Sequence, residues 1–425
     1  MTRVGLPTYD SFKDSGIDWI GQIPAHWEQI PNKHIFRLKK SLVGKRTSEY
    51  ELLSLTLRGI IKRDMENPEG KFPAEFDTYQ EVSPSDFVFC HFDVEETPRT
   101  VGLSEFFGMI TGAYTVYSVA DGIDPRFLLH FYIFADTNKK MRSLYKGLRN
   151  TIPKEAFGAF KTPLPPIEEQ REIVAHIDEA SRKIEDAIAI KEQQIALLRE
   201  RRQILTQQIV TSGPNPDVPM KDSGIDWIGQ IPGHWEVKRN KHMFVEVNQR
   251  SAKGTEQHLS MSQKLGLVPA NLVEKSLVSE SYEGAKLVQP GDLVLNRLKA
   301  HLAVFSIAPM EGLVSPDYSV FRPFVEGASS QYYEALFKTS KYLGEFRLRV
   351  RGIVEGFYRL YTDSFMDIPL LIPPQAEQDE IVAHLNELAV RYETAISIKQ
   401  DQIAALKEYK TSLIDAAVTG KIKVI

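Results

Sequence analysis

The sequence predicts an α+β protein built from two similar halves, each a mixed domain of strands and helices followed by one long helix. Three observations predict this fold class: a sixteen-residue phrase that occurs twice, a long helical segment that also occurs twice, and short β-rich runs between them. The chain has 425 residues and is 42% apolar. A chain of this length exceeds what one hydrophobic core usually holds, so we expect two or more domains.

The repeated phrase shows that the chain contains an internal duplication. Residues 13–28 read KDSGIDWIGQIPAHWE and residues 221–236 read KDSGIDWIGQIPGHWE, which differ only at Ala25 and Gly233. We call each copy a tag. We expect Trp27 and Trp235 to be structural anchors that hold each tag against its neighbours, and a binding role for the adjacent histidine and tryptophan is the alternative.

The second repeated feature is a long segment with the periodicity of a helix. PPIEEQREIVAHIDEASRKIEDAIAIKEQQIALL starts at Pro165, and PPQAEQDEIVAHLNELAVRYETAISIKQDQIAAL starts at Pro373. Their apolar residues step by three and four, which predicts continuous helices over 167–211 and 375–419. Each helix is about 65–70 Å long at 1.5 Å per residue. Because one seam alone would face water, we expect the two helices to pack antiparallel as a coiled coil within a pseudo-two-fold repeat.

A lysine interrupts each apolar seam at the same place, Lys191 in the first helix and Lys399 in the second. Polar residues inside a seam can set the register of paired helices. Long lysine side chains can also lie along apolar surface with the charge in water. The sequence leaves both interpretations open.

The middle of each half shares a skeleton of turns and strands with the other. LLSLTLRGIIKRD aligns with HLSMSQKLGLVPAN, and VSPSDFVF aligns with VQPGDLVL. Such runs, bounded by Pro, Gly and Asp, predict strands, and helices are expected near 126–149 and 328–349. The predicted limits are 1–162 for the first tag and mixed domain, 163–213 for the first long helix, 214–370 for the second tag and mixed domain, and 371–425 for the second helix and tail.

The sequence lacks the usual signatures of an enzyme, a metal site or a membrane protein. It has no GxGxxG, GxxxxGK[ST] or GxSxG pattern, so we predict no catalytic residue. Pro290, Asp292 and Arg297 resemble a nuclease fragment, but GDLVLNR fits a turn and a strand better. Cys90 is the only cysteine and the histidines are scattered, so no metal is expected. No apolar run would span a membrane, and we expect a cytoplasmic protein.

Polar side chains in the two middles are candidates for contact with DNA. Arg and Lys pair with guanine edges, Asn and Gln pair with adenine edges, and all of them bind phosphate. The net charge of −4 gives no overall basic signal, and a solvated face is the alternative interpretation. The predicted DNA-binding residues are Arg58, Lys62 and Arg63 in the first half, and Gln263, Lys264, Asn296, Arg297 and Lys299 in the second, with Arg347, Arg349 and Arg351 further on.

The combined arrangement resembles the specificity subunit of type I restriction-modification systems. The resemblance rests on the GQIPxHWE tags, the two dissimilar middles, the helices introduced by PP and EQ with IVAH following, and the closing LIDAAVTGKI. It covers essentially the whole chain. It implies that each middle is a target recognition domain that reads one half of a split sequence in double-stranded DNA.

The resemblance also implies the partners. In that family the paired helices separate the two domains and dock two copies of an adenine methyltransferase subunit, and a motor-nuclease restriction subunit joins them. This chain would then bind no cofactor itself, and S-adenosylmethionine would belong to the methyltransferase. Helices of fixed length require the two half-targets to lie near one turn of DNA apart. The alternatives are a coiled-coil scaffold for two protein-binding modules and, less favoured, an enzyme with an unfamiliar active site.

Overall fold

The computed structural model describes residues 7–64, 76–263, 265–273, 281–354 and 357–424. The chain forms two compact units, one made of residues 1–191 with 401–425 and the other of residues 192–400. Both units take one part of each long helix. The domain limits expected from the sequence give each long helix a segment of its own, and those limits stay a prediction.

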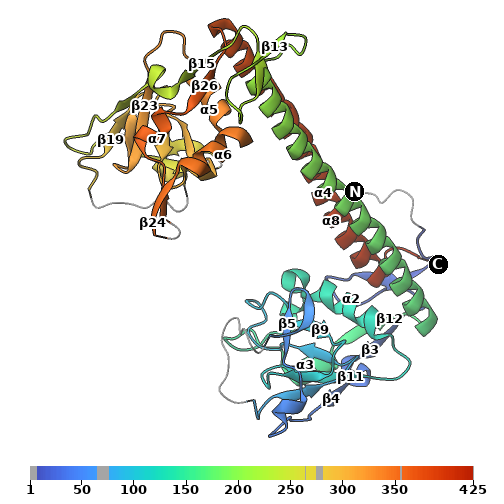
Figure 1. Ribbon diagram of the computed structural model, residues 1–425. Coiled ribbons are helices and arrows are strands. Elements are labelled where there is room, and N and C mark those ends of the chain that lie inside the picture. The colour runs from blue at the N-terminus through green and yellow to red at the C-terminus, as the bar shows by residue number, and fades with distance from the viewer. Residues whose placement is uncertain (1–6, 65–75, 264, 274–280, 355–356, 425) are drawn as a thin grey trace. The chain divides into compact units, whose positions relative to one another are not determined.

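The first unit begins with a tag, continues into a mixed domain and ends in the first long helix (Figure 1). Its short helical turns are α1 (Asn32–Ile35), η1 (Thr47–Glu49), η2 (Thr137–Leu144) and α3 (Lys154–Ala159), and its main domain helix is α2 (Pro125–Asp136). Its strands are β1 (Phe12–Asp14), β2 (Gln22–Pro24), β3 (Glu28–Pro31), β4 (Phe36–Lys39), β5 (Leu53–Thr56), β6 (Gly59–Lys62), β7 (Gln80–Val82), β8 (Phe87–Phe89), β9 (Val101–Leu103), β10 (Gly108–Ile110), β11 (Thr115–Val119) and β12 (Lys161–Leu164).

The second unit repeats this order with small additions. Its helices are η3 (Asn240–His242), η4 (Ala270–Leu272), η5 (Ala300–Leu302), α5 (Ser330–Phe337), α6 (Ser340–Arg349) and α7 (Thr362–Met366). Its strands are β13 (Met220–Asp222), β14 (Gln230–Pro232), β15 (Glu236–Arg239), β16 (Phe244–Val247), β17 (Leu259–Ser262), β18 (Gly266–Pro269), β19 (Lys286–Val288), β20 (Leu293–Asn296), β21 (Phe305–Ile307), β22 (Gly312–Val314), β23 (Tyr318–Pro323), β24 (Arg351–Val354), β25 (Phe357–Arg359) and β26 (Pro369–Ile372).

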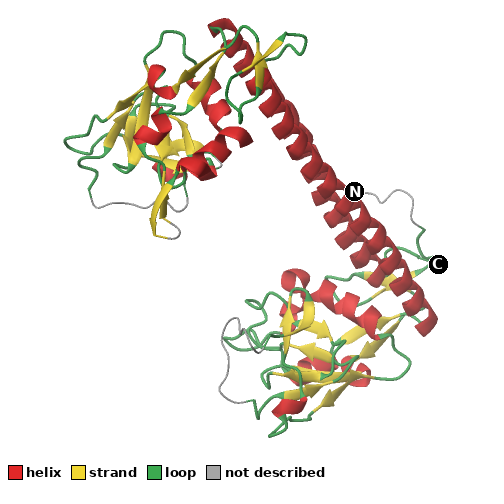
Figure 2. Ribbon diagram, in the orientation of Figure 1, coloured by secondary structure: helices red, strands yellow, loops and turns green. Residues whose placement is uncertain are grey.

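Each mixed domain is built on a four-stranded antiparallel sheet with the same connectivity. Figure 2 shows the strands of each domain in yellow. The strand order is β4-β11-β8-β9 in the first domain and β16-β23-β20-β21 in the second. The registers also match, because Phe89 lies opposite Thr115 in one sheet and Leu295 lies opposite Ser319 in the other. Aromatic side chains fill the core behind each sheet. The internal repeat predicted from the sequence is therefore confirmed strand by strand.

The two long helices are α4 (Ile167–Ser212) and α8 (Gln375–Val418), and each is continuous as predicted. In the first unit, Lys410 Nζ of α8 donates to Glu185 Oε1 of α4 at 2.5 Å. In the second unit, Arg202 of α4 pairs with Glu393 of α8 at 3.3 Å. Within each unit, residue numbers rise along one helix as they fall along the other, so the predicted antiparallel packing is confirmed.

The apolar seam between the helices is buried as the periodicity indicated. In the first unit, Ile173 and Ile177 share one core with Leu413 and Ala417. In the second unit, Val210 shares a core with Ile381. Burying these side chains removes apolar surface from water at roughly 25 cal/mol per Å². This burial is the main reason why two long helices with many charged residues stay paired.

The shorter helices are less extensive than the sequence predicted. The helix expected near 126–149 ends at Asp136, because Asn138 and Lys139 adopt φ values of 59° and 50° and turn the chain. The helix expected near 328–349 is interrupted between α5 and α6, where Thr339 is extended and its hydroxyl donates to Leu336 O at 2.7 Å. The apolar periodicity of both segments is continuous, but a backbone turn ends the first helix and a turn with a side-chain hydrogen bond at Thr339 divides the second.

A glutamate at the start of each long helix holds the tag. Trp27 is fully buried and its indole N–H donates to Glu169 Oε1 at 2.9 Å. His26 Nε2 lies 2.7 Å from the other carboxylate oxygen, and the Tyr9 hydroxyl donates to Oε1 at 2.6 Å. Burial and the neighbouring carboxylate raise the pKa of Tyr9. One buried carboxylate thus contacts two adjacent residues of the tag, His26 and Trp27, and Tyr9, which precedes the tag.

The second tag repeats this arrangement. The Trp235 indole donates to Glu377 Oε2 at 3.0 Å, and His234 Nε2 lies 2.6 Å from the same oxygen. Trp235 is also fully buried. Both tryptophans therefore sit in the cores where the sequence analysis expected structural anchors, and the pairing of each histidine with a glutamate accounts for its place in the motif.

We predict that Glu169→Ala destabilises the full chain by about 1–3 kcal/mol, because the buried donors of Trp27 and Tyr9 lose their acceptor. Glu168→Ala is the matched control, since Glu168 is exposed and pairs with Arg171 on the helix surface, where such pairs contribute about 0–1 kcal/mol. Urea unfolding measures both variants. Equal losses of stability in the two variants would contradict the anchoring role.

Candidate nucleic-acid interface

The basic residues predicted in the first domain lie on one hairpin. Strands β5 and β6 pair with Thr56 opposite Gly59, so Leu57 and Arg58 form the turn. Arg58 is exposed, and its backbone N–H donates to Thr56 Oγ1 at 3.1 Å. That bond holds the turn while the guanidinium extends into solvent. The geometry leaves the Arg58 side chain able to reach a ligand.

The other two residues of this cluster lie at the end of the same hairpin. Lys62 forms an ion pair with Glu51 at 3.4 Å, and its ammonium lies 5.6 Å from the centre of the Phe106 ring. Arg63 follows directly and is half-buried. Arg58 therefore lies at the turn of the hairpin, whereas Lys62 and Arg63 lie at its other end, and Lys62 already has an acidic partner.

A cleft of about 670 Å³ opens in the second domain, between the β17–β18 hairpin, the end of β20 and the start of β23. Three of the predicted residues, Gln263, Asn296 and Lys299, line it. His258 and Tyr318 line it as well, and the sequence analysis did not single them out. Lys264 lies outside the described residues. We call this feature the second-domain cleft.

The polar side chains of the second-domain cleft are held in place before any ligand arrives. Asn296 Oδ1 accepts a hydrogen bond from the backbone N–H of Leu298 at 3.1 Å, and its side chain also hydrogen-bonds to Tyr318. Burial raises the pKa of Tyr318, which keeps its hydroxyl protonated. Burial lowers the pKa of His258, whose ring lies 4.2 Å from the Tyr282 ring. A neutral imidazole offers one donor and one acceptor.

Arg297, also predicted to bind DNA, does not line the second-domain cleft. Its Nε donates to Asp317 O at 2.7 Å, and its guanidinium also pairs with the Asp317 carboxylate at 3.7 Å. Its carbonyl accepts from Leu360 N at 2.9 Å. Arg297 therefore joins three segments of the domain, whereas the neighbouring Lys299 is exposed at the cleft.

The nuclease-like fragment around Asp292 is structural in this fold. The Asp292 side chain is 1% exposed and accepts two hydrogen bonds from Arg322, at 2.6 and 2.7 Å. It also accepts from Gln289 N at 2.8 Å, which closes the turn before β20. Asp86 makes the matching bond to Ser83 N in the first domain. Among the described residues, no three His, Cys, Asp or Glu side chains gather as a metal site would require.

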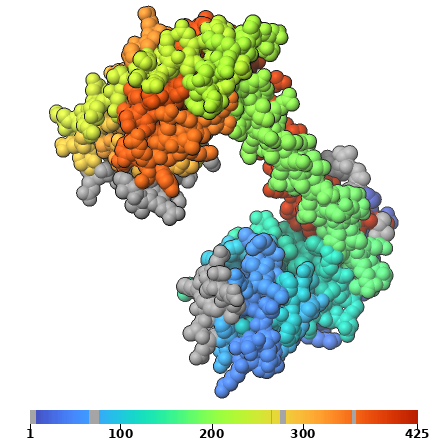
Figure 3. Space-filling model, viewed as in Figure 1, coloured from blue at the N-terminus to red at the C-terminus, as the bar shows by residue number. Residues whose placement is uncertain are grey.

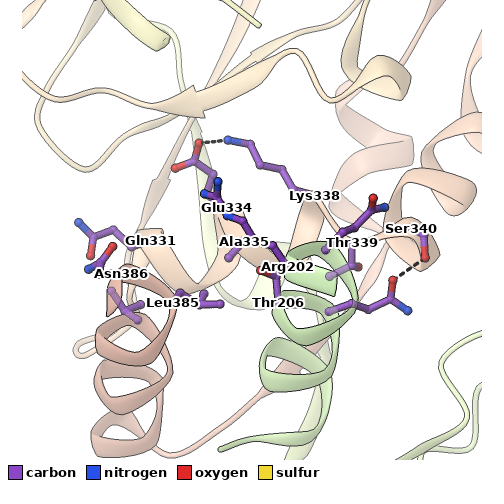
Figure 4. Close-up of a pocket in the computed structure, with 13 residues that line it drawn as sticks. Arg202, Thr206, Gln331, Glu334, Ala335, Lys338, Thr339, Ser340, Leu385 and Asn386 are labelled. Carbon is purple, nitrogen blue, oxygen red and sulfur yellow. Dashed lines mark hydrogen bonds and ion pairs between the residues drawn. The ribbon is translucent and has the colours of Figure 1, made fainter. Parts of the chain in front are cut away.

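A second cavity, of about 440 Å³, lies where α5 and α6 meet residues of α4 and α8 in the second unit (Figure 4). Ser340 Oγ donates to Gln207 Oε1 at 2.7 Å across it, and Glu334 binds Lys338 at its edge. Ala335 contributes only a methyl group here. At the matching point of the first unit stands His130, whose pKa is lowered to about 4 by burial and then by Arg126. The cavity therefore lies where the second unit has the small Ala335 and the first unit has the larger His130.

Neither unit contains a helix with the length and apolar character needed to cross a bilayer, within the part of the chain that the structure describes. Cys90 is buried, and burial raises the pKa of its thiol, as expected for a packed side chain. The second-domain cleft and the β5–β6 hairpin are two features of the described domains that offer polar side chains to a ligand.

Comparison with known proteins gives a consistent result over the full chain. No protein-family model matches it. The chain is 20% identical to the MjaX type I restriction enzyme specificity subunit of Methanocaldococcus jannaschii, over 95% of this chain and 96% of that protein. It is also 20% identical to the EcoKI type I restriction enzyme specificity subunit of Escherichia coli, over 95% of this chain and 90% of that protein.

Two solved structures share the fold. One chain, from a study of complex assembly and conformational transition in the type I R-M system, aligns with a TM-score of 0.62 at 14% identity, over 93% of this chain and 98% of that one. The HsdS subunit of Thermoanaerobacter tengcongensis aligns with a TM-score of 0.52 at 15% identity, over 94% and 98%. The resemblance inferred from the tags and helices is confirmed: along nearly its whole length, this chain is similar in sequence to type I restriction enzyme specificity subunits and shares the fold of an HsdS subunit.

Proposed function

We propose that this chain is the sequence-specific DNA-binding subunit of an adenine methyltransferase complex and reads a bipartite, asymmetric target in double-stranded DNA. The observation that carries the proposal is that the two domains share one backbone fold but present different side chains at their surfaces. The turn aspartates Asp86 and Asp292 and the sheet registers are shared. The side chains on this scaffold differ, because the first domain carries Arg58 at the turn of the β5–β6 hairpin and the second carries Asn296 and Lys299 in its cleft. Two such domains suit two different half-targets.

The exposed side chains of the domains have the chemistry that DNA recognition needs. Arginine and lysine contact phosphates and guanine edges, and amides contact adenine edges. The formal net charge is −4, so this chain alone supplies little general attraction to DNA. Partner subunits with basic surfaces would provide the remaining phosphate contacts, and binding would then fall as the salt concentration rises.

The long helices provide candidate docking surfaces for two methyltransferase subunits. In the second unit, Leu197 and Ile204 lie seven residues apart on α4 and are 55% and 58% exposed. Figure 3 shows the green part of α4 at the surface of the protein. Val390 of α8 is 66% exposed in the same unit. In the first unit, Ile190 and Tyr409 are exposed apolar residues of the same two helices. Apolar side chains repeated along a helix face are typical of a surface that another protein covers.

Catalysis belongs to the partners in this proposal. S-adenosylmethionine would be bound by the methyltransferase subunits, and a motor-nuclease subunit would join through them. The rival function is a coiled-coil scaffold that holds two protein-binding modules, and it also needs exposed apolar helix faces. The two functions differ in whether the domains select a DNA sequence.

Selection from a pool of random DNA duplexes tests the proposal. We expect the purified complex of this chain and its cognate methyltransferase to enrich one motif with two specified parts and a fixed gap. Leu197→Ser with Ile204→Ser should reduce methyltransferase co-purification, whereas Gln193→Ser with Gln208→Ser, polar changes on the same helix, should not. A complex that assembles but enriches no sequence would support the scaffold.

Lys299 and Arg297 separate contact with DNA from support of the fold. We expect Lys299→Ala to weaken methylation of the target with methyltransferase binding intact, at a cost of about 1–3 kcal/mol for one lost contact. The double change of Arg297 and Lys299 to alanine should weaken methylation further, and it should also lower the unfolding temperature because Arg297 loses Asp317. Unchanged methylation in the double variant would remove both residues from the site.

A fragment of residues 1–213 tests whether the halves are equivalent. Without α8, the seam of α4 faces water, so two fragments should pair through it and read an inverted repeat of the first half-target. Methylome sequencing of cells that express the fragment with the methyltransferase measures this. A soluble, dimeric fragment without inverted-repeat methylation would show that the halves are not equivalent. The seam residues concerned are Ile173, Ile177, Ile184, Ile188, Ile195, Leu198 and Leu205.

A further inference from the structure

The two domains can be compared position by position because their backbones make the same contacts. Leu52 bridges to Met109 in the first domain, and His258 bridges to Leu313 in the second. After each hairpin, a backbone N–H donates to the carbonyl of this bridging residue. Arg63 N donates to Leu52 O at 2.8 Å, and Ala270 N donates to His258 O at 3.0 Å. Leu52 and His258 therefore occupy equivalent positions.

The same reasoning pairs Cys90 with Asn296. Cys90 directly follows β8 and Asn296 is the last residue of β20, and each backbone N–H donates across to the next strand or loop, to Thr100 O at 2.8 Å and to Val304 O at 3.2 Å. The tyrosine opposite is retained, because Tyr114 N donates to Thr111 O and Tyr318 N donates to Ser315 O in matching turns. The scaffold is thus shared at positions where the side chains change.

At both positions, the first domain has a less polar side chain and the second domain has a more polar one. Where the first domain has a buried leucine and a buried cysteine, the second has an imidazole and a carboxamide that line the second-domain cleft. In the first domain, Phe92 stacks on Tyr114 with ring centres 6.1 Å apart, and Arg149 lies over Phe92 at 5.5 Å. A leucine and a cysteine fit this scaffold, so the fold does not require His258 or Asn296.

Polar groups in a cleft are costly unless they gain a partner, since each loses hydrogen bonds to water. The carboxamide of Asn296 is fixed by Leu298 and Tyr318, so little rotational freedom is lost when it meets a ligand. A fixed amide with both a donor and an acceptor matches the edge of adenine, and the nearby Lys299 suits guanine or a phosphate.

We propose that the second-domain cleft reads the second half-target, with Asn296 and His258 as specificity-determining residues that contact base edges and Lys299 as a charged contact at its edge. The proposal rests on the DNA-binding function proposed above. It adds that Leu52 and Cys90 are the counterparts of His258 and Asn296 in the first domain. The different side chains at these two positions then contribute to the different targets of the two domains.

The test replaces each residue by its counterpart from the first domain. Asn296→Cys and His258→Leu introduce side chains that the matching scaffold already accommodates. The full chain is purified with its cognate methyltransferase, and the motif is first mapped with the unchanged complex. Methylation is then measured on duplexes with the mapped motif and with every single-base change in each half. Asn248→Cys, on an exposed asparagine outside the cleft lining, is the matched control.

We expect each cleft variant to methylate the mapped duplex roughly 5- to 150-fold more slowly, the range for one lost bidentate contact. Discrimination should relax at one or two base pairs of a single half, with the other half read as before. Asn248→Cys should keep the original rate and motif. Unfolding temperature and co-purification with the methyltransferase report whether each variant is folded and assembled.

Two results would overturn the assignment. Folded variants that retain the original rate and motif would show that the cleft does not read bases. Variants that lose folding or assembly would show that Asn296 and His258 support the scaffold, contrary to the comparison of the two domains. Failure of the unchanged complex to methylate any bipartite motif would instead overturn the proposed function, and the two failures are therefore distinguishable.

Discussion

The buried glutamate at the start of each long helix is the interaction on which the rest of each unit depends. Glu169 in the first unit and Glu377 in the second accept hydrogen bonds from the tryptophan of the adjacent tag. The end of the other long helix packs against the same tryptophan. A side chain in place of Gly420 would come within 2.3 Å of Pro24 and 3.3 Å of Trp27, and one in place of Gly213 within 2.6 Å of Glu377. Tag, helix start and helix end therefore meet at one point in each unit.

Glycine is required at these two helix ends for conformation as well as for space. Gly213 and Gly420 have φ values of 77° and 66°, in the left-handed region that ends many helices. The bond from Lys421 N to Ala416 O, at 2.8 Å, completes the turn after α8. Lys421 Nζ then donates to Gln22 O, and Lys423 N donates to Pro7 O. The C-terminal tail thus binds the first tag through hydrogen bonds. In the second unit no such tail is needed, because the chain runs directly from α4 into the second tag.

The sequence predicted the parts of the fold that follow from periodicity and repetition. The first long helix was expected over 167–211 and is observed over Ile167–Ser212, because its seam of apolar residues leaves only one buried face. The duplication indicated two equivalent domains before any strand was placed. Apolar periodicity predicted too long a helix near 126–149. The helix ends at Asp136, because Asn138 and Lys139 have positive φ values that the periodicity does not indicate.

The candidate site was harder to predict because its residues come from segments that are distant in sequence. Gln263, Asn296 and Lys299 were identified by their chemistry and do line one cleft. His258 and Tyr318 were not singled out, because neither belongs to a motif and only the structure shows that both line the second-domain cleft. Arg297 was chosen for its charge, yet Asp317 holds its side chain. The alignment of the two middles already places Leu52 against His258, a change of chemistry just before equivalent strands, but the sequence alone did not show that this position faces a cleft.

Mapping of methylated adenines in cells with and without this chain tests the central claim most directly. The methyltransferase would be expressed in both cases, so that only the specificity component differs. The account predicts methylation at one bipartite, asymmetric motif, on adenines in both strands, that disappears when the chain is removed. An identical methylation pattern in the two cell populations would contradict the account.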